Sequence, residues 1–181
     1  TGSTSIEKYL NPYKSAYKFT PQYGPYNTHC SLEKIYSKYP GIRDYFKFAI
    51  VRNPFDWIVS WYSYRKTVSN KNNTQNVTFK DWLVDANSTA YNREGIGLTL
   101  SQYDIIKGNE AININFIGRF ENLQQDFDTI CDKIGIPQQK LPHVNESKHR
   151  HYTEYYDYET RSIVYELYAK DIEYFGYEFG E

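Results

Sequence analysis

The chain has 181 residues, and its 21 Lys and Arg almost balance its 22 Asp and Glu, for a net charge of −1. Hydrophobic residues make up 40% and charged residues 24%, as in globular proteins, which disfavours a disordered chain. The near-neutral charge disfavours a nucleic-acid coat or a polybasic membrane anchor, and no apolar run approaches the ~20 residues of a membrane helix.

The first half of the chain is predicted to place one buried strand among helices. The strand segment is nearly continuous in aromatic and β-branched residues, which is the pattern of a strand covered on both faces. A proline soon after it suits the first turn of a following helix. In chain order the segments are helix 6–10, loop 11–28, helix 31–36, strand 45–51, a helix starting at Pro54, loop 67–78 and helix 79–85.

The second half continues this alternation of strands and helices. A second apolar segment ends at Gly118-Arg119-Phe120, and Asn122 is a candidate cap for the next helix. In chain order the segments are an irregular stretch 87–101, strand 112–117, helix 123–134, basic loop 138–153 and an amphipathic helix from Asp157 or Thr160 to Phe175. This alternation predicts one α/β domain over residues 1–181, built around a parallel sheet.

Small and hydroxyl residues open the chain directly before its first helix. The stretch Thr1-Gly2-Ser3-Thr4-Ser5 can direct backbone N–H groups, hydroxyls and a helix dipole at an anion. The Walker spacing G-x-x-x-x-G-K-[ST] is absent. On its own, the stretch is explained better as an ordinary Ser/Thr helix cap.

Two further groups could bind a phosphate. Arg52 follows the first strand, where open α/β sheets bind ligands, and Ser60 lies about two helical turns later. An Arg fork and a hydroxyl can hold one phosphate, although a salt-bridged Arg and a packed Ser have the same pattern. The run Lys148-His149-Arg150-His151, followed by Tyr152, could bind a phosphate and stack on a base, or be solvated surface.

Together these stretches resemble the sulfotransferases, most closely the carbohydrate (heparan-type) group. Residues 48–62 look like the family's 3′-phosphate-binding strand and helix, and residues 1–5 like the end of its 5′-phosphosulfate loop, Pro-Lys-Thr-Gly-(Gly/Ser)-Thr-Ser. Residues 115–123 and 171–177 also resemble family members, in the same order. The resemblance implies the sulfotransferase fold, a P-loop-like parallel β-sheet flanked by helices.

The resemblance also implies an activity. The enzyme would move a sulfuryl group from 3′-phosphoadenosine 5′-phosphosulfate (PAPS) to an acceptor hydroxyl, expected on a carbohydrate, and release 3′-phosphoadenosine 5′-phosphate (PAP). Thr1 to Ser5 would hold the 5′-phosphosulfate, and Arg52 and Ser60 the 3′-phosphate. Residues 148–152 would close over the nucleotide, with Lys148 or Arg150 near the 3′-phosphate. No metal is required where cationic side chains and a helix N-terminus supply the charge.

His29 is the candidate general base. It precedes the phosphate-binding strand, as the catalytic His of the similar heparan-type enzymes does, and an imidazole can deprotonate an alcohol near neutral pH. A helix-capping or packed His before Ser31 is the alternative. The neighbouring Cys30 forms no acyl-transfer constellation, so Cys30 and Cys131 are expected to be reduced and structural.

One departure from the family pattern concerns the start of the chain. The family's loop lysine, which contacts the bridging oxygen of the donor, should stand just before Thr1, after the first strand. Neither is in this sequence, which also contains no Met. We therefore expect the native protein to continue upstream, so that residues 1–181 are an N-terminally incomplete domain with its first strand missing.

Two other functions stay open. One is a glycan-binding protein that kept the fold and lost catalysis. The other is a nucleotide-dependent kinase, which the missing Walker spacing and the lack of an evident Mg²⁺-holding aspartate disfavour. Residues 63–101 are expected to shape the acceptor side, where Arg65, Lys66, Lys71 and Arg93 could meet an anionic glycan.

The sequence indicates neither the acceptor nor the oligomeric state, and no nucleic-acid partner is expected. A bacterial or viral protein of this kind would be soluble and cytoplasmic. A truncated animal-type enzyme would come from the Golgi lumen.

Overall fold

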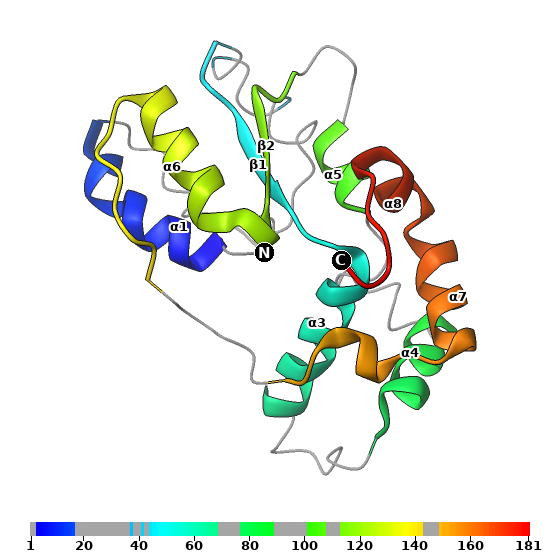
Figure 1. Cartoon of the computed structure of the whole chain (residues 1–181). Helices are drawn as coiled ribbons and strands as arrows, with labels where there is room; N and C mark the ends of the chain where they lie inside the picture. The colour runs from blue at the N-terminus through cyan, green and yellow to red at the C-terminus, as the bar shows by residue number, and fades with distance from the viewer. Residues whose placement is uncertain are drawn as a thin grey trace. The chain divides into compact units, whose positions relative to one another are not determined.

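The structure is a computed structural model, and it describes residues 3–16, 37, 41, 44–68, 77–88, 101–107, 113–142 and 149–181. The chain divides into two compact units, one of residues 1–51 and 104–145, the other of residues 52–103 and 146–181. Each unit has its own apolar core, and Figure 1 labels the helices and strands of the chain. The expectation of one domain over 1–181 stays a prediction.

The first unit contains a parallel pair of strands and its helices. β1 (Phe48–Val51) pairs with β2 (Phe116–Arg119), with Phe48 opposite Phe116 and Val51 opposite Arg119. The other described elements are α1 (Ser3–Leu10), the 3₁₀ helices η1 (Asn11–Ala16) and η5 (Phe120–Asn122), and α6 (Leu123–Ile134). A mixed α/β fold with parallel strands is therefore confirmed.

The core of the first unit lies between α1, α6 and the strands. Phe127, Ile130 and Cys131 of α6 are fully buried, and Ile6 of α1 packs with them. The second strand runs two residues beyond its predicted end at 117, and its Gly118 approaches neighbouring side chains closely. A Cβ at Gly118 would lie 2.8 Å from Ile50 Cδ1.

The second unit is helical over the residues that the structure describes. Its elements are α3 (Pro54–Val68), α4 (Phe79–Ser88), the 3₁₀ helix η6 (Tyr152–Tyr155), α7 (Tyr158–Leu167) and α8 (Ala169–Phe175). The short helix α5 (Gln102–Lys107) crosses the boundary between the units. The core face of α3 consists of Phe55, Ile58, Val59 and Tyr62, which lie at helical spacing and are all buried.

The long C-terminal helix predicted from Asp157 or Thr160 to Phe175 is wrong as a single helix. It consists of α7 and α8, which meet at Tyr168, and Tyr168 is 1% exposed and has a non-helical ψ of 25°. Packing of this large side chain into the core accompanies the break. Asp157 is the cap of α7, because its carboxylate accepts the Thr160 N–H while the Thr160 hydroxyl bonds back to the Asp157 N–H.

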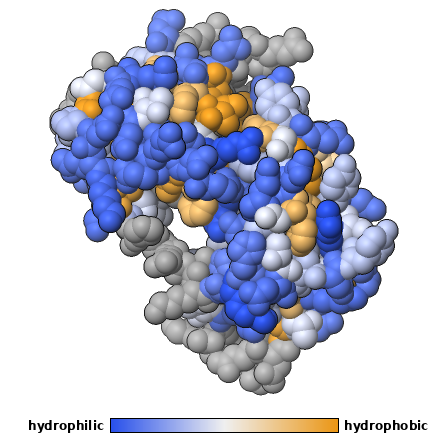
Figure 2. Space-filling model, viewed as in Figure 1, coloured by the Kyte–Doolittle hydropathy of each residue, from blue (hydrophilic) through white to orange (hydrophobic). Residues whose placement is uncertain are grey.

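The surface is mostly hydrophilic on the face that Figure 2 shows. The exposed large apolar side chains of the described residues are chiefly tyrosines, of which Tyr158, at 90%, is the most exposed. Within the described ranges, no helix is both long and apolar enough to cross a membrane.

Candidate functional site

Arg52 is a buried cation directly after β1. The residue is 8% exposed, and its Nε donates to Asp56 Oδ2 at 2.7 Å. Asp56 lies in the first turn of α3, so the ion pair joins Arg52 to the start of that helix within the second unit. Arg52 is therefore salt-bridged, which is one of the two alternatives that the sequence left open for it. The same contact fixes the direction of the guanidinium group.

The start of α3 is held by Asn53, which is 1% exposed. Its Oδ1 accepts the Phe55 N–H at 3.1 Å, which is the bond of a helix N-cap. Its Nδ2 donates to the Glu178 carbonyl at 2.9 Å, so the same side chain ties the helix start to the C-terminal segment. These two bonds hold the backbone that follows Arg52 in place within the second unit.

The side-chain amide of Gln102 forms two hydrogen bonds with the backbone of Arg52, and we call this pair of bonds the bracket. The Arg52 N–H donates to Gln102 Oε1 at 2.9 Å, and Gln102 Nε2 donates to the Arg52 carbonyl at 2.8 Å. Gln102 is itself 8% exposed and begins α5. Nothing in the sequence marked it, because 50 residues separate it from Arg52.

Asp171 supports the start of α5. Its carboxylate is fully buried and accepts the N–H groups of Gln102 at 2.9 Å and Tyr103 at 2.7 Å. Burial raises the pKa of this carboxyl above its usual range, while those two N–H donors and the Ser101 hydroxyl oppose the rise. The sequence placed Asp171 only in the stretch that resembles family members at 171–177.

Ser60 is half-buried, two turns into α3. On an α-helix the residues three and seven positions later, Ser63 and Thr67, share its face. Both line an open cavity of about 570 Å³ in the second unit. The other residues that line it are Tyr62, Lys66, Thr78, Phe79, Lys80, Arg150, Glu154 and Tyr155.

Two cations of this cavity rest beside aromatic rings. Lys66 Nζ lies 5.3 Å from the centre of the Tyr62 ring, and Arg150 Cζ lies 5.4 Å from that of Tyr155. The Arg150 side chain is 70% exposed, with Nη1 3.3 Å from Glu154 Oε2. An exposed pair of this kind is weak, so Arg150 can turn toward an anionic ligand at little cost.

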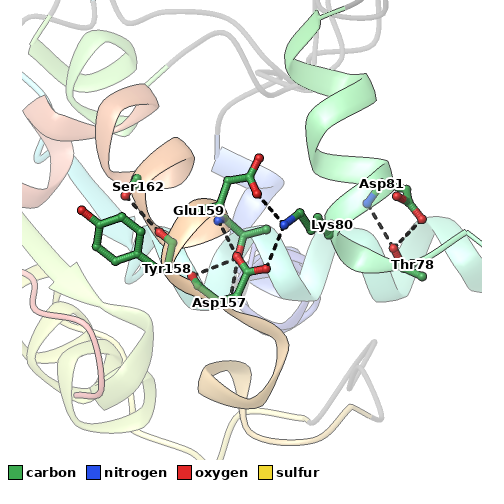
Figure 3. Close-up of polar contacts among 8 residues, drawn as sticks. Thr78, Lys80, Asp81, Asp157, Tyr158, Glu159 and Ser162 are labelled. Carbon is green, nitrogen blue, oxygen red and sulfur yellow. Dashed lines mark hydrogen bonds and ion pairs between the residues drawn. The ribbon is translucent and has the colours of Figure 1, made fainter.

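The third cation, Lys80, is engaged between two helices (Figure 3). Its Nζ pairs with Asp157 at 3.1 Å and with Glu159, and these contacts, Glu159 first, raise the pKa of Lys80. The Thr160 N–H and hydroxyl, with help from Lys80, lower the pKa of Asp157 to about 2. Lys80 therefore stabilises the junction of α4 and α7.

Tyr152 lies in the core of the second unit. It is 3% exposed, its ring centre is 5.7 Å from that of Phe179, and its hydroxyl accepts the Gly180 N–H at 2.7 Å. The same hydroxyl donates to the Glu181 carbonyl at 3.1 Å. Both the ring and the hydroxyl are thus used within the protein.

The hydroxyl residues of the first motif form the start of α1 in the first unit. The helix begins at Ser3, Thr4 is exposed and Ser5 is 7% exposed. The first turn of α1 contains no acidic residue. Four predicted site residues lie outside the described residues, namely Thr1, Gly2, His29 and Lys148. Among the residues that the structure describes, no three His, Cys, Asp or Glu side chains gather as a metal-binding group.

Comparisons with known proteins agree with the sequence motifs. A protein of Archaeoglobus fulgidus, described only as uncharacterized, is 30% identical over 103 residues, which are 56% of this chain and 77% of that protein. No solved structure matches the chain significantly. The model of the sulfotransferase family matches residues 2–178. Because that match spans nearly every residue, the chain belongs to the sulfotransferase family.

Proposed function

We propose that this protein transfers a sulfuryl group from PAPS to a hydroxyl of an acceptor, for which a carbohydrate is the expected class. Membership of the family supports sulfuryl transfer. The observation that carries the donor assignment is the fixed guanidinium of Arg52, between the end of β1 and the first turn of α3.

Arg52 and Ser60 bind the 3′-phosphate of the nucleotide in this proposal. A guanidinium offers several N–H donors in fixed directions, and its bonds to phosphate are about twice as strong as neutral hydrogen bonds. The burial of Arg52 favours this role, because charges interact more strongly where water is excluded. The N-terminus of α3 adds the positive end of a helix dipole, which Asp56 partly offsets.

Arg150 is the described member of the 148–151 run that suits the nucleotide. It lines the same cavity as Ser63 and Thr67, which continue the helical face of Ser60. Lys148 stays a second candidate from the sequence. Tyr152 is left out of the nucleotide site, because its ring and hydroxyl are engaged in the core.

The remaining roles rest on the sequence. Ser3, Thr4 and Ser5, with Thr1 and Gly2 before them, donate hydrogen bonds to the 5′-phosphosulfate, and the dipole of α1 adds positive potential. His29 accepts the proton of the acceptor hydroxyl while the oxygen of that hydroxyl forms its bond to sulfur. The bond between sulfur and the 5′-phosphate oxygen breaks, and PAP leaves with that electron pair. As in phosphoryl transfer, positioning and charge stabilisation supply most of the acceleration.

The donor assignment is tested by measuring PAP binding calorimetrically to the native full-length protein and to Arg52→Gln. Loss of charge-assisted bonds to phosphate, each worth ~1.5–3 kcal/mol, should weaken PAP binding about 10–150-fold. Arg161→Gln is the matched control, because that guanidinium lies 4.5 Å above the Phe179 ring and takes no part in the proposed site. Unchanged PAP binding by Arg52→Gln, or stabilisation by ATP with Mg²⁺ and not by PAP, contradicts the assignment.

A further inference from the structure

We propose that Gln102 and Asp171 are positioning residues that hold Arg52 ready for the 3′-phosphate. The inference rests on the proposed function, since Arg52 must first be a phosphate ligand. It goes beyond that function because neither residue is expected to touch the nucleotide. Both would act through the backbone of Arg52, which they hold by a chain of hydrogen bonds.

The backbone of Arg52 needs such a partner because of its place in the chain. The paired ladder of β1 and β2 ends where Val51 faces Arg119, so Arg52 is the first residue past it. A buried N–H and C=O must find partners elsewhere. Gln102 supplies both, since one end of its amide accepts the Arg52 N–H and the other donates to the Arg52 carbonyl. The amide thus supplies the two backbone hydrogen bonds that a neighbouring strand would otherwise give to Arg52.

Asp171 fixes the amide that forms this bracket. Its two carboxylate oxygens accept the N–H groups of Gln102 and Tyr103, the first two residues of α5. The carboxylate comes from the first turn of α8 and is fully buried, so it cannot exchange these donors for water. The position of α5, and with it that of the Gln102 side chain, therefore depends on Asp171.

The bracket and the Asp56 contact act on different parts of Arg52. Gln102 holds the backbone, and Asp56 holds Nε of the guanidinium. An arginine held at both its backbone and its guanidinium loses little freedom when it binds a phosphate, which is the advantage of preorganisation. Without Gln102, the residue after β1 could shift, and the guanidinium would shift with it.

The test compares the dissociation constants of PAP and adenosine 5′-phosphate, which lacks the 3′-phosphate. The ratio of the dissociation constant of adenosine 5′-phosphate to that of PAP isolates the 3′-phosphate contribution, and a merely structural loss would weaken the binding of both ligands alike. We expect Gln102→Leu to reduce the ratio roughly tenfold, the effect of one charge-assisted bond. Gln102→Glu is a second, nearly isosteric variant, which keeps the acceptor but loses the donor, and should reduce the ratio in the same direction.

Gln124→Leu is the matched control, because Gln124 forms a similar bracket in the first unit. Its Nε2 donates to the Gln139 carbonyl at 3.1 Å, and its Oε1 accepts the Leu141 N–H at 2.8 Å. This control should leave the ratio unchanged. Asp171→Asn should lower the ratio as Gln102→Glu does.

Each outcome of this comparison either supports or overturns the positioning role of Gln102 and Asp171. A preference for PAP that falls in the Gln102 variants and persists in Gln124→Leu supports the inference. A preference that persists in the folded Gln102 variants, or that falls equally in Gln124→Leu, overturns it and leaves the proposed function standing. If the native protein itself does not prefer PAP, the proposed 3′-phosphate site fails, and the positioning role fails with it.

Discussion

Gly118→Ala should destabilise the first unit through a measurable steric conflict. The new methyl group would lie 2.8 Å from Ile50 Cδ1 and 3.0 Å from Asp126 Cβ, where carbon atoms prefer about 3.5–4.0 Å. Ile50 is on the neighbouring strand and belongs to the packing of the core. Asp126 lies in α6, where its Oδ2 accepts the Arg119 N–H at 2.5 Å. Ile50 Cδ1 is the far end of a flexible side chain and can rotate aside, whereas Asp126 Cβ can move only with the backbone of α6.

The size of the effect follows from these contacts. Overpacking of a core typically costs ~1–3 kcal/mol, and displacement of Asp126 forfeits a hydrogen bond of ~0.5–1.5 kcal/mol. The substitution also lowers the conformational entropy of the unfolded chain, which offsets ~0.4–1 kcal/mol of this loss of stability. Together these contributions give a net loss of about 0.5–4 kcal/mol, which is a fall in melting temperature of about 1–16 °C for a chain of this length.

Urea and thermal unfolding measure this loss directly. Gly41→Ala is the matched control, because among the described residues no atom lies within 4 Å of a Cβ at position 41. The control should be neutral or slightly stabilising. If Gly118→Ala unfolds at the same urea concentration as the native protein, the close approach of β2 to α6 is not as described.

Further predictions concern the α7 cap, the core and the candidate base. The pKa of Asp157 is about 2 when folded, so its contribution to stability is present above its usual pKa of 3.8 and is lost as pH falls toward 2. Asp157→Asn should flatten that acid loss in pH-dependent unfolding, whereas Glu166→Gln, exposed on the same helix, should keep it. Tyr152→Phe should lose about 1 kcal/mol of stability with PAP affinity unchanged, since its hydroxyl bonds Gly180 and Glu181 within the protein. A large loss of PAP affinity would return Tyr152 to the nucleotide site. His29→Ala should abolish sulfuryl transfer while PAP still binds, and near-normal turnover would remove His29 from the role of base.

Local signals predicted several elements well. The helix 123–134 has the predicted bounds, because Gly135 adopts a left-handed φ of 72° at its end. The core face of α3 follows from apolar residues at helical spacing, and burial of Ile58 and Val59 confirms it. Arg52 can be singled out as a candidate from the sequence because its place after a buried strand, and the family pattern around it, are local properties.

Other features depend on contacts that no local pattern carries. Gln102 and Asp171 are 69 residues apart, and each alone is an ordinary polar residue at the start of a helix. The break between α7 and α8 at Tyr168 coincides with the burial of its aromatic ring. The position of the Tyr152 ring also depends on contacts far along the chain. A tyrosine in a basic loop looks the same in the sequence whether its ring stacks on a ligand or packs in the core.

Sulfuryl transfer is tested most directly by incubating the native full-length protein with labelled PAPS and a panel of neutral and anionic oligosaccharides. We expect a sulfated oligosaccharide, one PAP released for each group transferred, and turnover that falls sharply in Arg52→Gln but not in Arg161→Gln. Binding of PAP with no transfer to any hydroxyl acceptor would contradict the enzymatic claim, and so would phosphate transfer from ATP in place of sulfuryl transfer.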